Sequence, residues 1–356
     1  MRERKGIKIG TPWTDLPKEL LEIISSFLPR LDVFRIRAVC RSWRSSITPF
    51  PNPVCLPHIV PYLTTPIRHL PPHPIILAES TVYHVSPPPH SQAAASTSSS
   101  CSSSWGWLLK LKHTQAPGHF HVLNCLSCTP TLFFPAYPKV INSLDFRVSE
   151  LAKAYNLHQP NDHKLACKVV VSSSSSSIVR IAAGVLCHLK IGDQNWTLID
   201  DIVSQLDYED AILYKKRFCA VDINGRAVAI KSCLEVMEIA SPLKGVDGTG
   251  DRKILVESAG DLLLVDKYHV KLKVFKLKEE EKQWVEVKSL DDRIMFLGDD
   301  CSFCIAAKDF GNGCKGNCIF FNHYSKFTVF DLEDSTLKPL QGHPAYKNIF
   351  GLARSF

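Results

Sequence analysis

Four cysteines near the end of the chain have the spacing C-x2-C-x9-C-x3-C: Cys301, Cys304, Cys314 and Cys318. Four thiolates at such intervals can hold a tetrahedral zinc ion. However, the flanking stretches SFCIAA (302–307) and CIFF (318–321) both have the composition of strands. Side chains alternate between the two faces of a strand, so the four thiols would not converge. We expect ordinary buried or loop cysteines and no bound metal.

Two pairs of carboxylates could in principle serve acid–base or cation chemistry: Asp291, Asp292, Asp299 and Asp300. They lie near expected turns, where aspartate commonly caps the backbone. The glycine-rich stretch GNGCKGN (311–317) lacks the spacing of a phosphate-binding loop, and CLSC (125–128) is too isolated to ligate alone. We therefore expect no catalytic residue, no cofactor and a chain that is not an enzyme.

Composition narrows the class of protein. The chain has 356 residues, 45% of them hydrophobic, which is enough for one large or two medium domains. No apolar run is long enough to span a bilayer, and the basic start MRERKGIKIG has no apolar segment behind it. We read that start as a solvated tail, with a weak nuclear-import patch as the alternative.

Charge and cysteine content bear on partners and compartment. A net charge of +7 is modest over this length, and no basic patch is interleaved with aromatic residues, so we expect no nucleic-acid partner. The thirteen cysteines are scattered without a framework spacing. This pattern is typical of a reducing compartment, and we expect the protein in the nucleus, the cytoplasm or both.

The chain separates by composition into four regions. We expect a polar tail at 1–12, a helical segment at 13–50, a linker rich in proline and serine at 51–104, and a β-rich body at 105–356. Within the linker, PIILAESTVYHV (74–85) has the pattern of a strand or hairpin. Within the body, only NSLDFRVSELAKAY (142–155) has the periodicity of a short helix.

The body contains a degenerate repeat. RFCAVDINGRAVAIKS (217–232) alternates apolar and polar residues around Asn224-Gly225, a strong hairpin signal. FCAVDINGR at 218 aligns with LLLVDKYHV at 262, an offset of 44 residues, and the same apolar-x-Asp step recurs at 327. We expect a closing strand after each of these, in LEVMEIASPL, WVEVKSL and LKPLQG, and one for an earlier unit in WTLIDDI (196–202).

Units of 40–50 residues with several short strands are typical of propeller blades. The fold class that we expect is a multi-domain α+β chain. A small N-terminal helical bundle precedes a mostly-β domain of the β-propeller type. An irregular sandwich of hairpins is the alternative for the body.

The helical segment carries more apolar residues than its own core needs. Leu16, Leu20, Ile24 and Leu28 recur every four residues, and Leu21, Ile23 and Phe27 widen that stripe. A unit of about 40 residues has too small a core to be stable alone. An excess of apolar surface on such a unit indicates that a protein partner completes the core.

WTDLPKELLEIISSFL, followed by LDVFRIRAVCRSWR, resembles an F-box. The body is similar to the kelch-like β-domain that follows the F-box in a large plant family. The stretches that carry this second likeness are FCAVDINGRAVAI, WVEVKSLDDRIMFLGDDCSF, AKDFGNGCKGNCIFF and VFDLEDSTLKPL.

The resemblance implies a substrate-recognition subunit of a Skp–cullin–F-box ubiquitin ligase. In that family the F-box docks on the Skp adaptor, which bridges to the cullin and RING subunits, and the C-terminal domain captures a target protein for ubiquitination. Carried over position by position, the adaptor-facing residues are Leu16, Pro17, Leu20, Leu21, Ile24, Leu28, Leu31, Val33, Val39, Cys40 and Trp43. For each of them, packing inside the bundle is the alternative.

Target-binding residues cannot be named from the sequence. The candidate rim loops are the turns around Asn224, Gly248, Glu280 and Gly313. Two other functions stay open: an F-box scaffold that acts outside a ligase, and a ligand-binding or enzymatic propeller with an F-box-like head. A pocket lined by convergent polar groups would favour the second of these.

Overall fold

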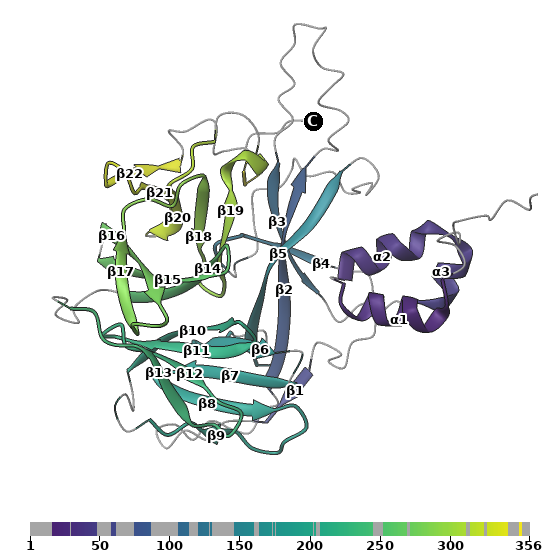
Figure 1. Ribbon diagram of the computed structural model, residues 1–356, viewed down its shortest axis with the longest axis horizontal. Helices are drawn as coiled ribbons and strands as arrows, with labels where there is room; N and C mark the ends of the chain where they lie inside the picture. The colour runs from purple at the N-terminus through teal and green to yellow at the C-terminus, as the bar shows by residue number, and fades with distance from the viewer. Residues whose placement is uncertain are drawn as a thin grey trace, which may run out of the picture. The chain divides into compact units, whose positions relative to one another are not determined.

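The computed structural model describes residues 16–28, 30–47, 58–61, 75–86, 106–113, 120–127, 129, 146–159, 164–172, 174, 176–201, 203, 207–244, 252–268, 271–310, 314–323, 326–340 and 349–350. The chain divides into two compact units, Met1–Pro53 and Val54–Phe356. The first is helical and the second is built from strands (Figure 1). Among the described residues, no helix has the length and hydropathy needed to cross a bilayer. The polar tail expected at 1–12 lies outside them.

Three short helices form the first unit: α1 (Lys18–Ser26), α2 (Arg30–Val39) and α3 (Arg41–Ser46). Pro17 stands at the N-cap of α1, where a missing N–H costs nothing, and its carbonyl accepts the backbone N–H of Leu21 at 3.2 Å. Cys40 caps α3, and its Sγ accepts the backbone N–H of Trp43 at 3.4 Å. Cys40 therefore separates α2 from α3 and satisfies one of the free backbone N–H groups in the first turn of α3.

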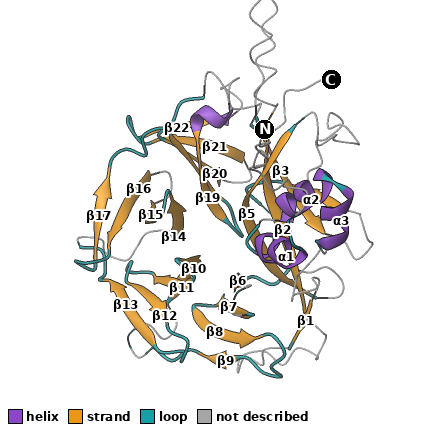
Figure 2. Ribbon diagram, turned by 45° about the vertical axis from the view of Figure 1, so that its right-hand side comes forward, coloured by secondary structure: helices purple, strands orange, loops and turns teal. Residues whose placement is uncertain are grey.

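The second unit is a β-propeller of five blades arranged around a centre (Figure 2). Blades two, three and four are regular antiparallel sheets in which the chain runs from the innermost strand outward. Blade two contains β6 (Lys168–Ser172), β7 (Ser177–Ala182), β8 (Val185–Lys190) and β9 (Thr197–Leu198). Blade three contains β10 (Tyr208–Tyr214), β11 (Arg217–Asp222), β12 (Ala227–Ile230) and β13 (Val236–Ala240). Blade four contains β14 (Arg252–Ser258), β15 (Asp261–Tyr268), β16 (Lys271–Lys278) and β17 (Gln283–Val287).

These blades explain the repeat in the sequence. The two segments offset by 44 residues are β11 and β15, the second strands of blades three and four. The four expected closing strands are confirmed, because they fall in β9, β13, β17 and the last strand of blade five, each the outermost of its sheet. The serine run begins at Ser172, the last residue of β6, and ends at Ser177, the first residue of β7, and these two residues pair with each other.

Blade one differs from the sequence expectation. It contains β1 (His58–Val60), β2 (Ile75–Ser86), β3 (Trp107–His113), β4 (Phe120–Leu123) and β5 (Arg147–His158). The first two lie in the segment expected to be a linker. Of the strand and the hairpin expected at 74–85, the strand is confirmed, because β2 is one continuous strand of 12 residues. One edge of β2 pairs with β5, while the other pairs with β1 and then β3.

The short helix expected at 142–155 is wrong, because residues from Arg147 onward form the strand β5. Its hydrogen-bonded register with β2 extends from Arg147 to His158. Pairing along the whole of β2 outweighs a weak helical periodicity, since the edge of such a long strand would otherwise be left open.

Blade five has its own order. It contains β18 (Arg293–Leu297), β19 (Ser302–Ala306), the 3-10 turn η4 (Ala307–Phe310), β20 (Cys318–His323), β21 (Lys326–Asp331) and β22 (Thr336–Pro339). The chain enters at the second position, turns inward to β19, and returns through η4 to place β20 parallel to β18. The apolar-x-Asp step at 327 therefore lies in β21, fourth from the centre, and is not equivalent to β11 and β15.

The hydrophobic core lies between the blades. Five separate clusters of buried apolar side chains join blade one to two, two to three, three to four, four to five and five back to one. The fifth-to-first cluster includes Phe296, which stacks on Phe303 and Phe320 with ring centroids 5.0 Å away in both cases. Each blade therefore packs against a neighbouring blade on both faces of its sheet.

Hydrogen bonds and an ion pair close the ring between blades five and one. The backbone N–H of Leu108 in β3 donates to the carbonyl of Ile349 at 2.7 Å. The Lys110 ammonium contacts both oxygens of Asp300 at 2.7 and 2.8 Å, and the Asn156 amide donates to the same carboxylate at 3.1 Å. The two side-chain contacts of Asp300 join residues that are 190 and 144 positions apart in the sequence.

The turn at Asn224-Gly225 joins blade three to blade four. Gly225 has a φ of +82°, and its carbonyl accepts the indole N–H of Trp284 at 2.7 Å. A Cβ atom at this position would lie 2.7 Å from Cγ of Leu243. Only glycine therefore satisfies both the backbone angle and the space.

We expect Gly225→Ala to lower the free energy of unfolding by about 2–4 kcal/mol, from left-handed strain and a steric clash together. Gly260→Ala is the matched control, because φ is +85° there but no atom lies within 4 Å of the added Cβ. The control should lose only about 1–2 kcal/mol. Urea unfolding of both variants measures the difference, and equal losses would show that Leu243 moves aside freely.

Candidate functional site

The helical unit has a small core of its own. Leu21, Val33 and Ile47 are between 1% and 4% exposed, and Leu16, Leu28, Ile36 and Trp43 pack against them. Leu21 and Val33 were expected on the adaptor-facing surface, but their side chains lie inside the bundle. Leu21 belongs to α1, Val33 belongs to α2 and Ile47 directly follows α3. Each of the three helices therefore contributes one side chain that fills the space between them.

A stripe of exposed apolar side chains remains on α1. Leu20, Ile23, Ile24 and Phe27 are 46%, 55%, 43% and 82% exposed. Their spacing of three and four residues places them on one side of the helix. Large apolar residues gathered this way are unusual on a surface that contacts only water. We define these four residues as the α1 stripe.

The remaining predicted residues divide between the surface and the core. Pro17 and Val39 are exposed, Val39 at 59%. Leu16, Leu28, Cys40 and Trp43 are partly buried, the first two and Trp43 against the bundle core. The side chain of Leu31 lies outside the described residues. Sequence reasoning left Ile23 and Phe27 off the expected surface, although both belonged to the widened apolar stripe.

The core and the stripe make separate predictions. We expect Leu21→Ala to destabilise the helical unit by about 2–4 kcal/mol, because it removes a fully buried leucine from a small core. Far-UV circular dichroism of the chain should show lost helical signal. Ile23→Ala, on the exposed stripe, is the control and should change stability by less than about 0.5 kcal/mol. A folded Leu21→Ala variant would contradict the assignment of the core.

Two family models match the chain in the same order as the two units. The model described as F-box domain matches residues 13–53, and the model described as KIB1-4 beta-propeller matches residues 75–344. F-box protein SKIP23 of Arabidopsis thaliana is 30% identical to this chain over an alignment of 397 positions. The alignment covers 95% of this chain and 93% of that protein. The chain belongs to the F-box proteins that carry a KIB1-4 β-propeller.

Other plant F-box proteins are similar to most of the chain. F-box protein At2g17036 of Arabidopsis thaliana is 28% identical over 362 residues, covering 90% of this chain and 86% of that protein. F-box/kelch-repeat protein At2g24250, of the same plant, is 27% identical over 341 residues, covering 89% and 84%. The expected family and fold class are confirmed. Membership implies, in general, binding to a Skp adaptor and a non-catalytic role as substrate adaptor of a Skp–cullin–F-box ligase.

Three of the four spaced cysteines of the KIB1-4 propeller lie at one hydrophobic cluster, and the fourth lies at another. Cys301 and Cys318 are buried in the cluster between blades five and one, and Cys314 packs against that cluster. Cys304 packs against the cluster between blades four and five, on the other face of β19. No group of three or more histidine, cysteine or acidic residues in the described part of the chain is arranged to hold a metal. Burial raises the pKa of the Cys304 thiol, against the lowering influence of Ser258 and Arg293.

The aspartates have structural contacts. The backbone N–H of Asp291 donates to Oγ of Ser289 at 3.0 Å in a turn, and Asp300 forms the ring-closing ion pair with Lys110. That role has no signal in the sequence, because Lys110 is 190 residues away. Lys315 of the glycine-rich stretch contacts Asp331 and Glu333 at 3.1 and 2.9 Å.

Two of the four expected rim loops lie within the described residues. The turn around Asn224 is held by Leu243 and Trp284, and the turn around Glu280 by a hydrogen bond from the backbone N–H of Ser241 to the carbonyl of Lys282 at 2.9 Å. Both turns therefore fasten neighbouring blades. The turns around Gly248 and Gly313 lie outside the described residues.

Proposed function

We propose that this F-box protein is a substrate-recognition subunit of a Skp–cullin–F-box ubiquitin ligase that captures a target protein with its propeller. The α1 stripe docks on the Skp adaptor, which links the chain to the cullin and RING subunits. The observation that carries the proposal is the exposure of the α1 stripe beside a bundle core that is already filled by Leu21, Val33 and Ile47.

Among the residues expected at the adaptor interface, we keep the exposed ones in direct contact: Pro17, Leu20, Ile24 and Val39, together with the newly assigned Ile23 and Phe27. Leu16, Leu28, Cys40 and Trp43 touch the adaptor only by their exposed portions. Leu21 and Val33 act indirectly, because they hold α1 and α2 in place. Burying four large apolar side chains supplies about 1.5–3 kcal/mol each at full burial, a sufficient source for a stable complex.

The mechanism is positional. A receptor that holds a target near a ubiquitin-charged enzyme raises the effective concentration of the target's lysines at that enzyme. The chain needs no catalytic residue for this role. The target is captured by the propeller, and its identity is open. Buried cysteines without a disulfide, such as Cys125, Cys187 and Cys219, suit a reducing compartment, and we place the complex in the nucleus or cytoplasm.

Reconstitution tests the proposal. Purified full chain is mixed with the Skp adaptor, the cullin and the RING subunit, and assembly is followed by size-exclusion chromatography. We expect one complex that contains all four proteins. Binding to the adaptor without recruitment of the cullin would instead support a scaffold that acts outside a ligase. Absence of adaptor binding would overturn the assignment of the F-box surface.

A further inference from the structure

We propose that a cavity at the centre of the propeller is a binding site for a small amphipathic monocarboxylic acid, whose carboxylate contacts the ammonium group of Lys168. The site lies in the propeller unit alone. The inference therefore goes beyond the proposed docking on a ligase adaptor and does not depend on it.

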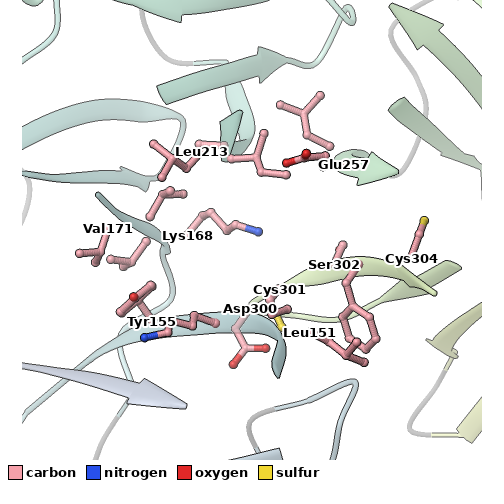
Figure 3. Close-up of a pocket in the computed structure, with 18 of the residues that line it drawn as sticks. Leu151, Tyr155, Lys168, Val171, Leu213, Glu257, Asp300, Cys301, Ser302 and Cys304 are labelled. Carbon is pink, nitrogen blue, oxygen red and sulfur yellow. The ribbon is translucent and has the colours of Figure 1, made fainter. Parts of the chain in front are cut away.

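The cavity has the size and position of a ligand site. Its volume is about 730 Å³, within the range of roughly 300–1,000 Å³ that is typical of small-molecule pockets. Every blade contributes to its wall, through Leu151 of β5, Lys168 of β6, Leu213 of β10, Glu257 of β14 and Ser302 of β19 (Figure 3). Convergence of five separate strands on one cavity makes it a property of the closed ring.

The two ends of the cavity differ in character. Lys168 at the start of β6 and Asp300 just before β19 line the cavity. Both are in buried ion pairs, Lys168 with Asp210 at 2.9 Å and Asp300 with Lys110 at 2.7 Å. Ser174, Ala259 and Gly260 follow the ends of β6 and β14, line the same cavity and are exposed. The cavity is therefore open at one end and reaches charged groups at the other.

The charge of Lys168 is only partly compensated. Asp210 is its ion-pair partner among the described residues, and this carboxylate also accepts the backbone N–H groups of Ala211 at 2.9 Å and Leu255 at 2.8 Å. The ammonium group has three N–H donors, so it can donate a further hydrogen bond to a ligand. Its side chain is 10% exposed, and Figure 3 shows the amine pointing into the cavity, whereas the carboxylate of Asp300 points away.

The walls select the rest of the ligand. Leu151 and Leu213 are partly exposed along the cavity and offer apolar surface to a hydrocarbon or aromatic body. Lys153 and Arg293 also line the cavity. The Lys153 ammonium lies 3.2 Å from a carboxylate oxygen of Glu79, which offsets its charge, so Arg293 adds the second positive charge on the wall. The Glu257 carboxylate is exposed on the same wall and would repel a second negative charge on the ligand. A single carboxylate on an apolar body therefore fits better than a phosphate or a dicarboxylate.

A matched pair of probes tests the charge requirement. Isothermal titration of the full chain with 4-phenylbutyrate should give saturable binding at or below about 1 mM, the weak end of specific association. Its uncharged amide, 4-phenylbutyramide, should bind at least about tenfold more weakly, because a hydrogen bond between two charged groups becomes one to a neutral acceptor. Absence of binding by the acid, or equal affinity for the acid and the amide, would overturn the proposal.

Two variants test the place of binding. Lys168→Met should weaken 4-phenylbutyrate binding at least about tenfold, whereas Lys273→Met, at an exposed lysine of β16, should leave it unchanged. Leu213→Trp fills the cavity and keeps the ion pair of Lys168, so it should abolish binding even if Lys168→Met fails to fold. Unchanged affinity in folded Leu213→Trp would refute the site. Adaptor binding should survive in all variants, so its failure would concern the proposed ligase function alone.

Discussion

We expect Leu20→Asp to abolish binding of the chain to the Skp adaptor while the helical unit stays folded. Leu20 is 46% exposed and is not among the side chains of the bundle core, so an aspartate there remains solvated in the free protein. In the complex the same carboxylate would lie among Ile23, Ile24 and Phe27 against an apolar partner surface. Burial of an unpaired charge costs several kcal/mol, which is comparable to the free energy of a moderate complex.

A pull-down with purified adaptor measures the effect, and circular dichroism confirms that the helices remain. Leu198→Asp is the matched control, since Leu198 in β9 of the propeller is 63% exposed and the chemical change is identical. The control should bind adaptor as the unaltered chain does. Retention of adaptor by Leu20→Asp at the same level would show that docking uses another surface.

The second large effect is expected at the ring closure. Asp300→Ala should lower the free energy of unfolding of the propeller by about 3–5 kcal/mol, because it leaves the Lys110 ammonium buried without its charged partner. The two side chains are 0% and 2% exposed in the native protein. Asn156 loses the same acceptor, which adds to the loss. The substitution weakens the contact between blade five and blade one, where the ring of blades closes.

Urea unfolding followed by tryptophan fluorescence gives the measurement. Glu235→Ala is the control, because it breaks the exposed ion pair with Lys231 and should change stability by less than about 0.5 kcal/mol. A loss of less than about 1 kcal/mol in Asp300→Ala would mean that the blades are held together by apolar packing alone.

Local patterns in the sequence predicted much of this protein. The helical segment was predicted from three features: apolar residues at helical spacing, Pro17 at its start, and the residues that resemble an F-box. The 44-residue offset matched β11 with β15, and the closing strands were found because each ends its sheet with a short, recognisable run. Features of this kind depend on residues within a few positions of each other.

The errors share a cause. Residues 147–155 have a helical periodicity, but they form β5 because β2, about seventy residues earlier, offers an open edge to pair with. The apolar-x-Asp pattern at 327 resembled the pattern in β11 and β15, which are the second strands of their blades. It lies instead in β21, the fourth strand of blade five, because β20 pairs in parallel with β18. Neither pairing partner can be read from the segment itself.

The sequence by itself therefore determined the two-part organisation, the blade-like repeat and the family, because these three features depend on local composition and residue spacing. Only the tertiary structure decided that Leu21 and Val33 lie inside the bundle while Leu20 and Phe27 lie outside, and that Lys110 meets Asp300. The physical reason is that burial and charge pairing depend on which distant segments fold against each other. A central cavity arises in the same way, since it exists only once five separate strands surround it.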